Sequence, residues 1–169
     1  MAKSGARRGA AKKKAAHGPG GRLFEVRRSD IHGRGGFALR TIPKGTRIVE
    51  YTGEKITWKE VWRRYPDDEA EGEQNHTFLF EVDDQHVIDA NRGGNTSRWI
   101  NHSCSPNCVV VDEGDRIFIE AGRTIRPGEE LRYDYNIQLD ERHTPAVKRR
   151  YVCFCGARAC RGTILGKKR

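Results

Sequence analysis

The sequence contains no run of about 18 apolar residues, so no segment is expected to cross a membrane as a helix. It also lacks an apolar stretch near the N-terminus of the kind that forms a secretory signal. These two absences predict an intracellular protein, in which thiols stay reduced. The five cysteines are an odd number, which is a poor basis for a disulfide framework.

Acidic residues are absent from both ends of the chain. Residues 1–22 hold seven Lys and Arg, residues 148–169 hold eight, and neither segment holds Asp or Glu. The body between them, residues 23–147, therefore has a net charge of −6, although the whole chain has +9. An acidic body suits a basic ligand, whereas the ends suit nucleic acid or another polyanion.

Apolar residues are also scarce, at 36% of 169 residues, and residues 1–21 are mostly Ala, Lys, Arg and Gly. That segment buries too little apolar area to offset its ordering entropy, so a disordered basic tail is predicted. Its role is either that of a solvated arm or that of a polyanion-binding arm. The remaining length is enough for one domain with its own core.

Short strands separated by turn signals dominate residues 23–137 and predict a mainly β fold. Hairpins are expected within 76–90, around Asp83 and Asp84, and within 107–125, around Glu113, Gly114 and Asp115. Thr57, with Glu60 three residues later, predicts the start of a short helix over 58–65. Residues 97–104 are expected to form a second helical turn. Further strands are expected at 23–29, 37–42, 47–54 and 130–137.

Three motifs contain residue types that suit a ligand site. HGRGGF, residues 32–37, has glycines that allow positive φ and close approach of the backbone to a ligand, although hairpin turns have the same composition. RWINHSCSPNC, residues 98–108, places Asn101 and His102 in an apolar-leaning turn, which suits either an amino-acid ligand or a satisfied buried turn. GEELRYDY, residues 128–135, puts two tyrosines on one face of a strand, where they form either a site or a core pair.

The cysteines are concentrated near the C-terminus, where Cys153, Cys155 and Cys160 fall within eight residues. A structural zinc site needs four ligands, so Cys104 or Cys108 would have to supply the fourth. Free buried thiols and disulfides are the alternatives.

Taken together, HGRGGFA, EYTGE, INHSCSPN, GEELRYDY and CFCGARACRG resemble a SET-domain protein with a post-SET segment. The motifs occur in the family's order and cover residues 22–163. The resemblance implies a SET-domain fold of short strands in small sheets, with few short helices and a C-terminal pseudoknot. It divides the chain into a basic tail (1–21), a SET domain (22–142) and a zinc-binding post-SET segment with a basic C-terminus (143–169).

The resemblance also implies the site residues, with Tyr135 as the catalytic tyrosine. The substrate lysine would enter a channel lined by Tyr51, Phe78 and Tyr133. One structural zinc ion would be held by Cys104, Cys153, Cys155 and Cys160, which leaves Cys108 free. Arg34 departs from the family's common forms, in which an aromatic or small residue is frequent. S-Adenosylmethionine would be held by His32, Gly33, Arg34, Gly35, Arg98, Asn101, His102, Tyr135 and Phe154.

The implied activity is S-adenosylmethionine-dependent methylation of a lysine, mostly to the mono- or dimethyl state, in a basic, histone-like or other nucleic-acid-associated protein. A nuclear or chromosome-associated location is expected in a eukaryote, and a cytoplasmic or nucleoid-associated one in a bacterium. The N-terminal segment resembles a histone tail and is itself a conceivable target. The alternative is a catalytically weak SET module that binds basic tails, or nucleic acid through its own basic ends. Acidic residues within 67–73 form either a lip for a basic substrate or a solvated loop.

Overall fold

The computed structural model describes residues 2–4, 21–66 and 78–167. Within them it has two α-helices, α1 (Trp58–Arg64) and α2 (Pro145–Arg150), and one 3-10 helix, η1 (Thr96–Trp99). The strands are β1 (Ala2–Ser4), β2 (Phe24–Arg28), β3 (Arg34–Ala38), β4 (Arg47–Tyr51), β5 (Glu54–Thr57), β6 (Leu79–Glu81), β7 (His86–Asp89), β8 (Asn101–His102), β9 (Cys108–Asp112), β10 (Ile117–Ala121), β11 (Arg132–Tyr133) and β12 (Ile137–Leu139).

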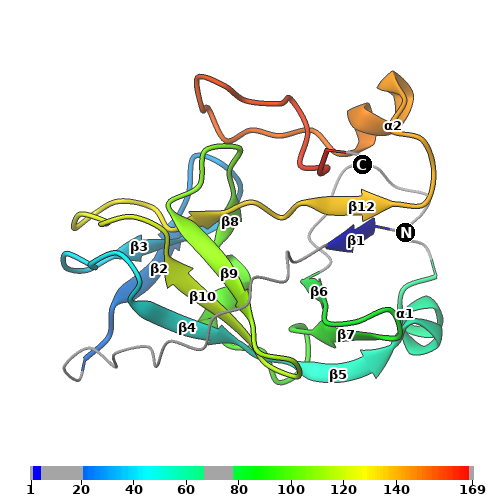
Figure 1. Ribbon diagram of the computed structural model, residues 1–169, viewed down its shortest axis with the longest axis horizontal. Coiled ribbons are helices and arrows are strands. Elements are labelled where there is room, and N and C mark those ends of the chain that lie inside the picture. Colours follow the sequence, from blue (N-terminus) through cyan, green and yellow to red (C-terminus); the bar gives the residue numbers. More distant parts are fainter. Residues whose placement is uncertain (1, 5–20, 67–77, 168–169) are drawn as a thin grey trace.

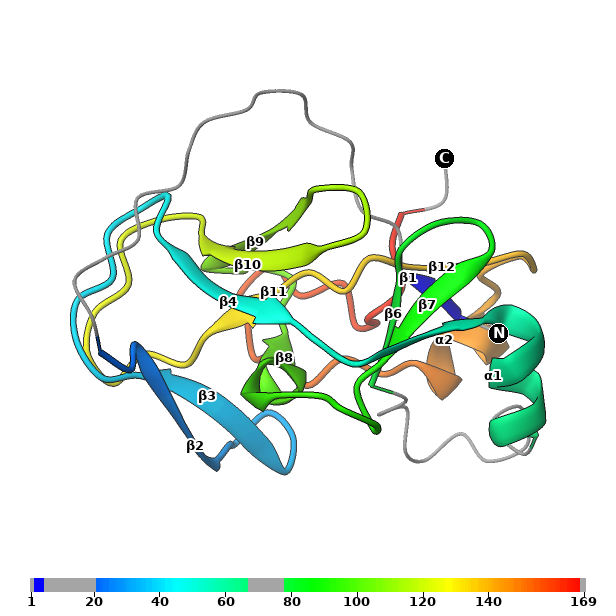
Figure 2. The same cartoon turned by 90° about the horizontal axis from the view of Figure 1, so that it is seen from below.

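The strands form several small sheets, which confirms the predicted mainly β fold. Two sheets have three strands each, in the orders β4–β10–β9 and β5–β7–β6, and the other strands form the pairs β2–β3, β8–β11 and β1–β12. Figures 1 and 2 show β5–β7–β6 with α1 at one end of the molecule and β2–β3 at the other. The C-terminal segment with α2 lies along β12.

Both predicted hairpins are present. β6 pairs antiparallel with β7 across Asp83 and Asp84, and β9 pairs antiparallel with β10 across residues 113–115. Helix α1 begins as the sequence predicts, because the Thr57 side chain accepts a hydrogen bond from the Glu60 N–H. The Glu60 carboxylate bonds Arg63 and Arg64 instead of returning to the cap.

The main core joins the two three-stranded sheets with the β2–β3 pair and with β11, whereas Leu139 of β12 packs in a separate, smaller cluster. The residues of the main core include Ile42, Ile117, Ile119, Ile125 and Leu131, none of which exposes measurable surface. Because burial of each such side chain stabilises the fold by roughly 1.5–3 kcal/mol, this core fixes the strands that carry the candidate site.

Several expectations differ from the structure. The strand expected over 37–42 ends at Ala38, and the strand expected over 130–137 divides into β11 and β12, with Tyr135 outside both. Residues 97–104 do not form one helical turn: η1 ends at Trp99, and Asn101 and His102 form β8, which pairs in parallel with β11. Arg34, Gly35 and Gly36 belong to β3, and among the motif's glycines only Gly33 has a positive φ, of 42°. In the basic tail, Ala2–Ser4 form a strand on β12 rather than a disordered segment.

The rest of the tail and the acidic run 67–73 lie outside the described residues. No helix in the part of the chain that the structure describes is long and apolar enough to span a membrane.

The parallel pairing of β8 with β11 places the NHSC and YDY motifs side by side. The threading of a pseudoknot stays a prediction.

Candidate active site and metal centre

An aromatic cluster surrounds Tyr135. The ring of Tyr51, at the end of β4, lies 5.1 Å from that of Phe80 in β6, and Phe80 lies 6.2 Å from Tyr133 in β11. The Tyr133 and Tyr135 rings are 4.8 Å apart. Segments distant in sequence therefore contribute to one buried aromatic surface. Phe80 was not among the predicted channel residues.

Two hydroxyls of the cluster donate to backbone carbonyls. Tyr51 Oη donates to the Phe78 carbonyl and Tyr135 Oη to the Ile100 carbonyl, each at 3.0 Å. Burial raises the pKa of Tyr51, Tyr133 and Tyr135 well above the ordinary tyrosine value. All three are therefore neutral phenols at physiological pH, suited to orienting a reacting group through a hydrogen bond rather than to acting as phenolate bases.

Phe78 has an unusual backbone, with φ of 48°. Its carbonyl accepts hydrogen bonds from both the Tyr51 hydroxyl and the Ala90 N–H, and its ring packs edge-on against Trp99 at 5.1 Å. These contacts hold a conformation that non-glycine residues rarely adopt. The guanidinium of Arg98 lies over the Trp99 ring at 4.9 Å and donates to the Ala90 carbonyl at 3.1 Å.

Asn101, only 3% exposed, links β8 to the HGRG segment. Its Nδ2 lies 2.8 Å from the Arg34 carbonyl and 2.8 Å from Glu130 Oε1. The His32 carbonyl is a more distant acceptor, at 3.4 Å. The structure thus brings Asn101 next to the segment His32–Gly35, the residues that the family resemblance assigns to the cofactor.

Glu130 is a member of this site that the sequence analysis missed. Its Oε1 accepts from Ser29 Oγ at 2.7 Å as well as from Asn101. A Cβ on Gly35 would come within 2.1 Å of the same oxygen, so the glycine is needed for close packing rather than for a turn. The sequence does contain two adjacent acids in GEEL, Glu129 and Glu130, but the pattern does not show which carboxylate points toward Asn101.

His102 connects Tyr135 with the cysteines. Its Nδ1 accepts the Tyr135 backbone N–H at 3.1 Å, and its Nε2 lies 3.4 Å from Cys104 Sγ. Burial lowers the pKa of His102 to about 4, against a raising effect of Asp134, so the imidazole is neutral. The Nδ1 contact then requires the tautomer with the proton on Nε2.

The four predicted zinc ligands converge, and Cys104 rather than Cys108 is the fourth. The sulfur atoms of the four cysteines lie within 4.8 Å of one another, and the shortest separations are 3.6 Å (Cys155–Cys160), 3.7 Å (Cys104–Cys153) and 3.9 Å (Cys104–Cys160). A tetrahedron with Zn–S bonds of about 2.3 Å has sulfur atoms ~3.8 Å apart, so the cluster has nearly the required size.

Backbone donors surround these sulfurs. Cys104 Sγ accepts from the Arg161 N–H, Cys153 Sγ from that of Cys155, Cys155 Sγ from that of Cys104, and Cys160 Sγ from that of Gly162, all at 3.3–3.5 Å. Burial raises the pKa of Cys104 and Cys153, whereas at Cys155 backbone donors and neighbouring thiols outweigh burial and lower the pKa of the thiol to about 6. Such donors stabilise thiolates, the form that binds metal.

Two contacts attach this cysteine segment to the tyrosine site. Cys104 follows His102 by two residues. Arg161 forms a bidentate ion pair with Asp134, at 2.7 and 2.8 Å, and Asp134 lies between Tyr133 and Tyr135 in the sequence. Phe154 is predicted to contact the cofactor, and its ring is 65% exposed. Cys108 is buried in β9, away from the cluster.

The family model of the SET domain matches residues 33–136 of the chain. Histone-lysine N-methyltransferase set-2 of Caenorhabditis elegans is 38% identical over 147 residues, which cover 85% of this chain and 9% of the relative. Histone-lysine N-methyltransferase trr of Drosophila melanogaster is 42% identical over 139 residues, with 79% and 5% covered. Histone-lysine N-methyltransferase 2B of Homo sapiens is 40% identical over 140 residues, with 80% and 5% covered. The chain spans less than a tenth of these relatives' length.

Proposed function

The chain belongs to the SET-domain family, and on that premise we propose that it is a protein-lysine N-methyltransferase that uses S-adenosylmethionine. The observation that carries the proposal is the position of Tyr135. Its ring contacts the aromatic cluster through Tyr133, and its backbone N–H bonds His102, beside Asn101. A lysine in the aromatic cluster and a cofactor at Asn101 would thus meet at Tyr135.

The cofactor fits the residues present. The buried Asn101 amide and the close approach of β3 at Gly35 form a polar cradle of backbone carbonyls, suited to the methionine amino group of S-adenosylmethionine. His32, Gly33, Arg34, Gly35, Arg98, Asn101, His102, Tyr135 and Phe154 would hold the cofactor, which supplies an electrophilic methyl group when bound. Of these residues Gly35, Asn101 and His102 are buried, whereas His32, Gly33, Arg34 and Phe154 are exposed.

The channel residues would prepare the substrate amine. A free lysine side chain has a pKa of about 10.4 and is mostly protonated at neutral pH. Tyr51, Phe78 and Tyr133 line a low-dielectric surface that disfavours the ammonium and lowers its pKa. The neutral Tyr135 hydroxyl, now on the Ile100 carbonyl, would orient the amine toward the methyl group.

Zinc fits the cysteine cluster for the reasons of size and backbone donors given above. Cys104, Cys153, Cys155 and Cys160 would hold one structural ion, and the ion would fix residues 143–169 as a post-SET segment. Residues 22–142 would be the SET domain. The metal would take no part in the chemistry, because four protein ligands leave no open position.

The substrate would be a basic protein or peptide, such as the histones named for the relatives, because the body of the chain carries −6. A chromatin or chromosome-associated setting follows from such a substrate. We place the product mainly at the mono- to dimethyl state, because Tyr133 rather than Phe stands two residues before Tyr135.

The test is transfer of labelled methyl groups from S-adenosylmethionine to core histones and other basic proteins, followed by mapping of the labelled lysine. Tyr135→Phe should abolish most transfer. Tyr65→Phe is the matched control, because it also removes one hydroxyl, from α1's C-terminal end rather than from the aromatic cluster. Equal activity of wild type and Tyr135→Phe would contradict the proposal.

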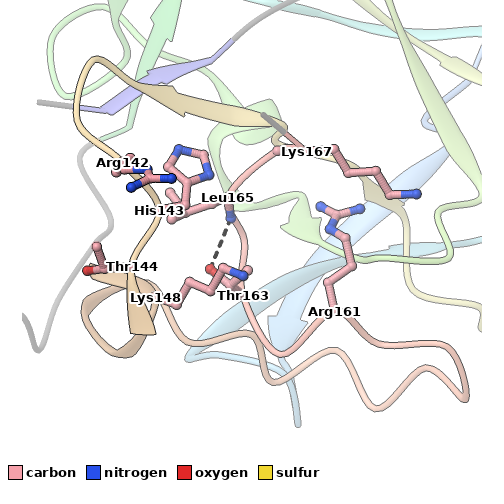
Figure 3. Close-up of a pocket in the computed structure, with 9 residues that line it drawn as sticks. Arg142, His143, Thr144, Lys148, Arg161, Thr163, Leu165 and Lys167 are labelled. Carbon is pink, nitrogen blue, oxygen red and sulfur yellow. Dashed lines mark hydrogen bonds between the residues drawn. The ribbon is translucent and has the colours of Figure 1, made fainter. Parts of the chain in front are cut away.

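A basic cavity favours nucleic acid as a second ligand. The cavity, of about 500 Å³, lies between α2 and the C-terminal segment, and no carboxylate lines it. Figure 3 shows Arg161 and Lys167 at one end and Arg142 and His143 at the other. Arg142, Lys148 and Lys167 line the cavity and are exposed, so their charged groups can reach phosphate oxygens.

Binding of a DNA duplex at several salt concentrations tests this second function. Replacing Arg142 and Lys148 by Gln should make the dependence of log K on log salt shallower by ~0.9 for each phosphate that the variant no longer neutralises. Lys59→Gln, on the exposed face of α1, is the control. An unchanged slope in the double variant would exclude the cavity as the DNA-binding surface.

A further inference from the structure

The basic N-terminal segment supplies a strand next to the candidate site. β1 pairs antiparallel with β12 in the register Ala2–Leu139, Lys3–Gln138 and Ser4–Ile137. The other side of β12 is already taken, because Ile137 forms a parallel bridge with Leu165. β1 thus occupies the edge of β12 that faces away from the C-terminal segment (Figure 1).

This edge of β12 lies close to the aromatic cluster. β12 begins two residues after Tyr135. β1 also contacts β6, which contains Phe80, and the Phe80 ring packs on Tyr51 and lies near Tyr133. A peptide strand between β12 and β6 therefore lies beside the residues proposed to line the lysine channel. Adding a strand to an open sheet edge is a common mode of peptide binding.

The residue at the centre of the added strand is a lysine. Lys3 stands opposite Gln138, three residues beyond Tyr135, so at most about 10 Å of chain separates these two positions, and less because Asn136 has φ of 47°. The segment has the charge of the proposed substrates, because residues 1–22 hold seven basic residues and no acid, against the −6 body. Backbone pairing and charge both favour this segment as a ligand of its own domain.

We propose that Lys3 is a methylation site of this chain's own active site, presented by the pairing of β1 with β12. The inference rests on the proposed function. The neutral Lys3 amine forms a bond to the methyl carbon, the bond from that carbon to the sulfonium sulfur breaks, and its electron pair stays on sulfur. S-Adenosylhomocysteine leaves, and the amine's proton passes to solvent.

Presentation within one chain is geometrically possible. The 17 peptide bonds from Ser4 to Gly21 can span up to ~60 Å, far more than a domain of this size requires. A covalent tether of this length gives a local concentration on the order of millimolar, so a weak strand–edge contact suffices. The reaction should therefore be first order in protein.

The experiment incubates the full-length protein with S-adenosylmethionine, alone and with an added histone peptide, and maps methyl groups by peptide mass spectrometry. Lys3 should be methylated at a rate independent of protein concentration. Lys3→Arg should lose this modification and keep transfer to the added peptide. A matched variant with Lys12, Lys13 and Lys14 replaced by Arg should still be methylated at Lys3.

Strand pairing is tested without the cofactor by hydrogen exchange of the β12 amides, residues 137–139. Ser4→Pro removes a backbone donor and fixes φ, so these amides should exchange faster, and Lys3 methylation should fall about tenfold. Lys3→Arg keeps the backbone and should exchange like the wild type.

The outcomes separate the two proposals. Transfer to the added peptide without Lys3 methylation, or β12 exchange unaffected by Ser4→Pro, overturns this inference and leaves the proposed function standing. A rate constant for Lys3 methylation that rises with protein concentration would contradict the proposal that each chain presents its own Lys3. Failure of transfer to both Lys3 and the peptide contradicts the proposed function itself, and β12 exchange still reports whether the strand forms.

Discussion

The two regions that meet at Tyr135 are held in place by different forces. The strands that carry Asn101 and the tyrosines pack on a core in which Ile117, Ile119 and Leu131 are completely buried. The C-terminal segment after residue 143 has a much smaller cluster, in which Val147 and Leu165 pack on Leu139 of β12. Its second support is the group of four cysteines.

The apolar core stabilises the strands that carry Asn101 and the tyrosines, whereas the C-terminal segment must be stabilised mainly by a metal ion. A small apolar cluster contributes a few kcal/mol, whereas a structural zinc site contributes apparent binding energies of roughly 10–16 kcal/mol. The C-terminal segment should therefore depend on zinc, and the tyrosine strands should not. Since Cys104 and Asp134 join the two regions, disorder in one would reach the cofactor site of the other.

The largest effect is expected from loss of the metal. The purified protein should carry one zinc ion per chain, and Cys155→Ser or a chelator should release it. Limited proteolysis should then cut within residues 143–167, and cofactor affinity should fall, while the melting transition of the tyrosine region persists. Metal analysis, proteolysis and calorimetry check these three results.

Cys108→Ala is the matched control, because it removes a thiol outside the cluster and should keep the zinc. Native protein without zinc, with all five thiols freely titratable, would contradict the metal centre. A single melting transition that disappears with the metal would show that the two regions are not separable.

Inside the tyrosine region, Tyr135→Phe and Asn101→Ala should have different consequences. Tyr135→Phe removes one hydroxyl and little volume, so methyl transfer should fall ~100-fold while cofactor binding persists. Asn101→Ala removes the amide that bridges Arg34 and Glu130, so cofactor binding itself should weaken. Calorimetric titration with S-adenosylmethionine, beside rate measurements, separates the two. Equal cofactor affinity in Asn101→Ala would remove Asn101 from the proposed cofactor site.

Local patterns were sufficient where the structure depends on neighbours in sequence. The Thr57 cap and the turns at 83–84 and 113–115 are decided within a few residues, and all three are present. Residues 97–104 were mispredicted because β8 exists only through its pairing with β11, some 30 residues away. No local pattern contains that information. Glu130 and β1 were missed for the same reason, since a distant partner defines each.

The fourth zinc ligand could not be predicted from local spacing. Spacing alone left Cys104 and Cys108 as equal candidates, and only the family resemblance selected Cys104. The structure explains the choice: Cys104 follows the short β8 strand, beside the C-terminal segment, whereas Cys108 lies within β9 and faces the core.

The N-terminal segment provides a third kind of region, in which the described residues 2–4 pair with β12 and contact β6. Removing residues 1–21 should lower the melting temperature by no more than ~2–4 °C, the effect of about 1 kcal/mol in a domain of roughly 150 residues. Catalysis on a short added peptide should persist, because no predicted site residue lies there. Affinity for DNA should fall and depend less on salt. Complete loss of the melting transition would show that the segment belongs to the folded domain.

The smallest expected effect concerns the product rather than the fold. Tyr133 is buried beside Tyr135, with the rings 4.8 Å apart, and burial keeps its hydroxyl protonated by raising its pKa. A neutral hydroxyl here can bond the amine or an ordered water at the end of the channel. That bond occupies space needed by an added methyl group and restrains a methylated amine from turning back into line.

A further transfer would then have to break this bond or expel the water, at a cost of about 1 kcal/mol or more. The penalty is roughly tenfold in rate for each additional step. The wild type should therefore stop mainly at monomethyl-lysine, with some dimethyl product. Tyr133→Phe should shift the product toward dimethyl and trimethyl without abolishing activity, as measured by mass spectrometry of one reacted peptide over time. If the wild type makes mostly trimethyl product at early times, the limit lies at another channel residue, and Phe78, held at its unusual φ against Trp99, is the first to replace.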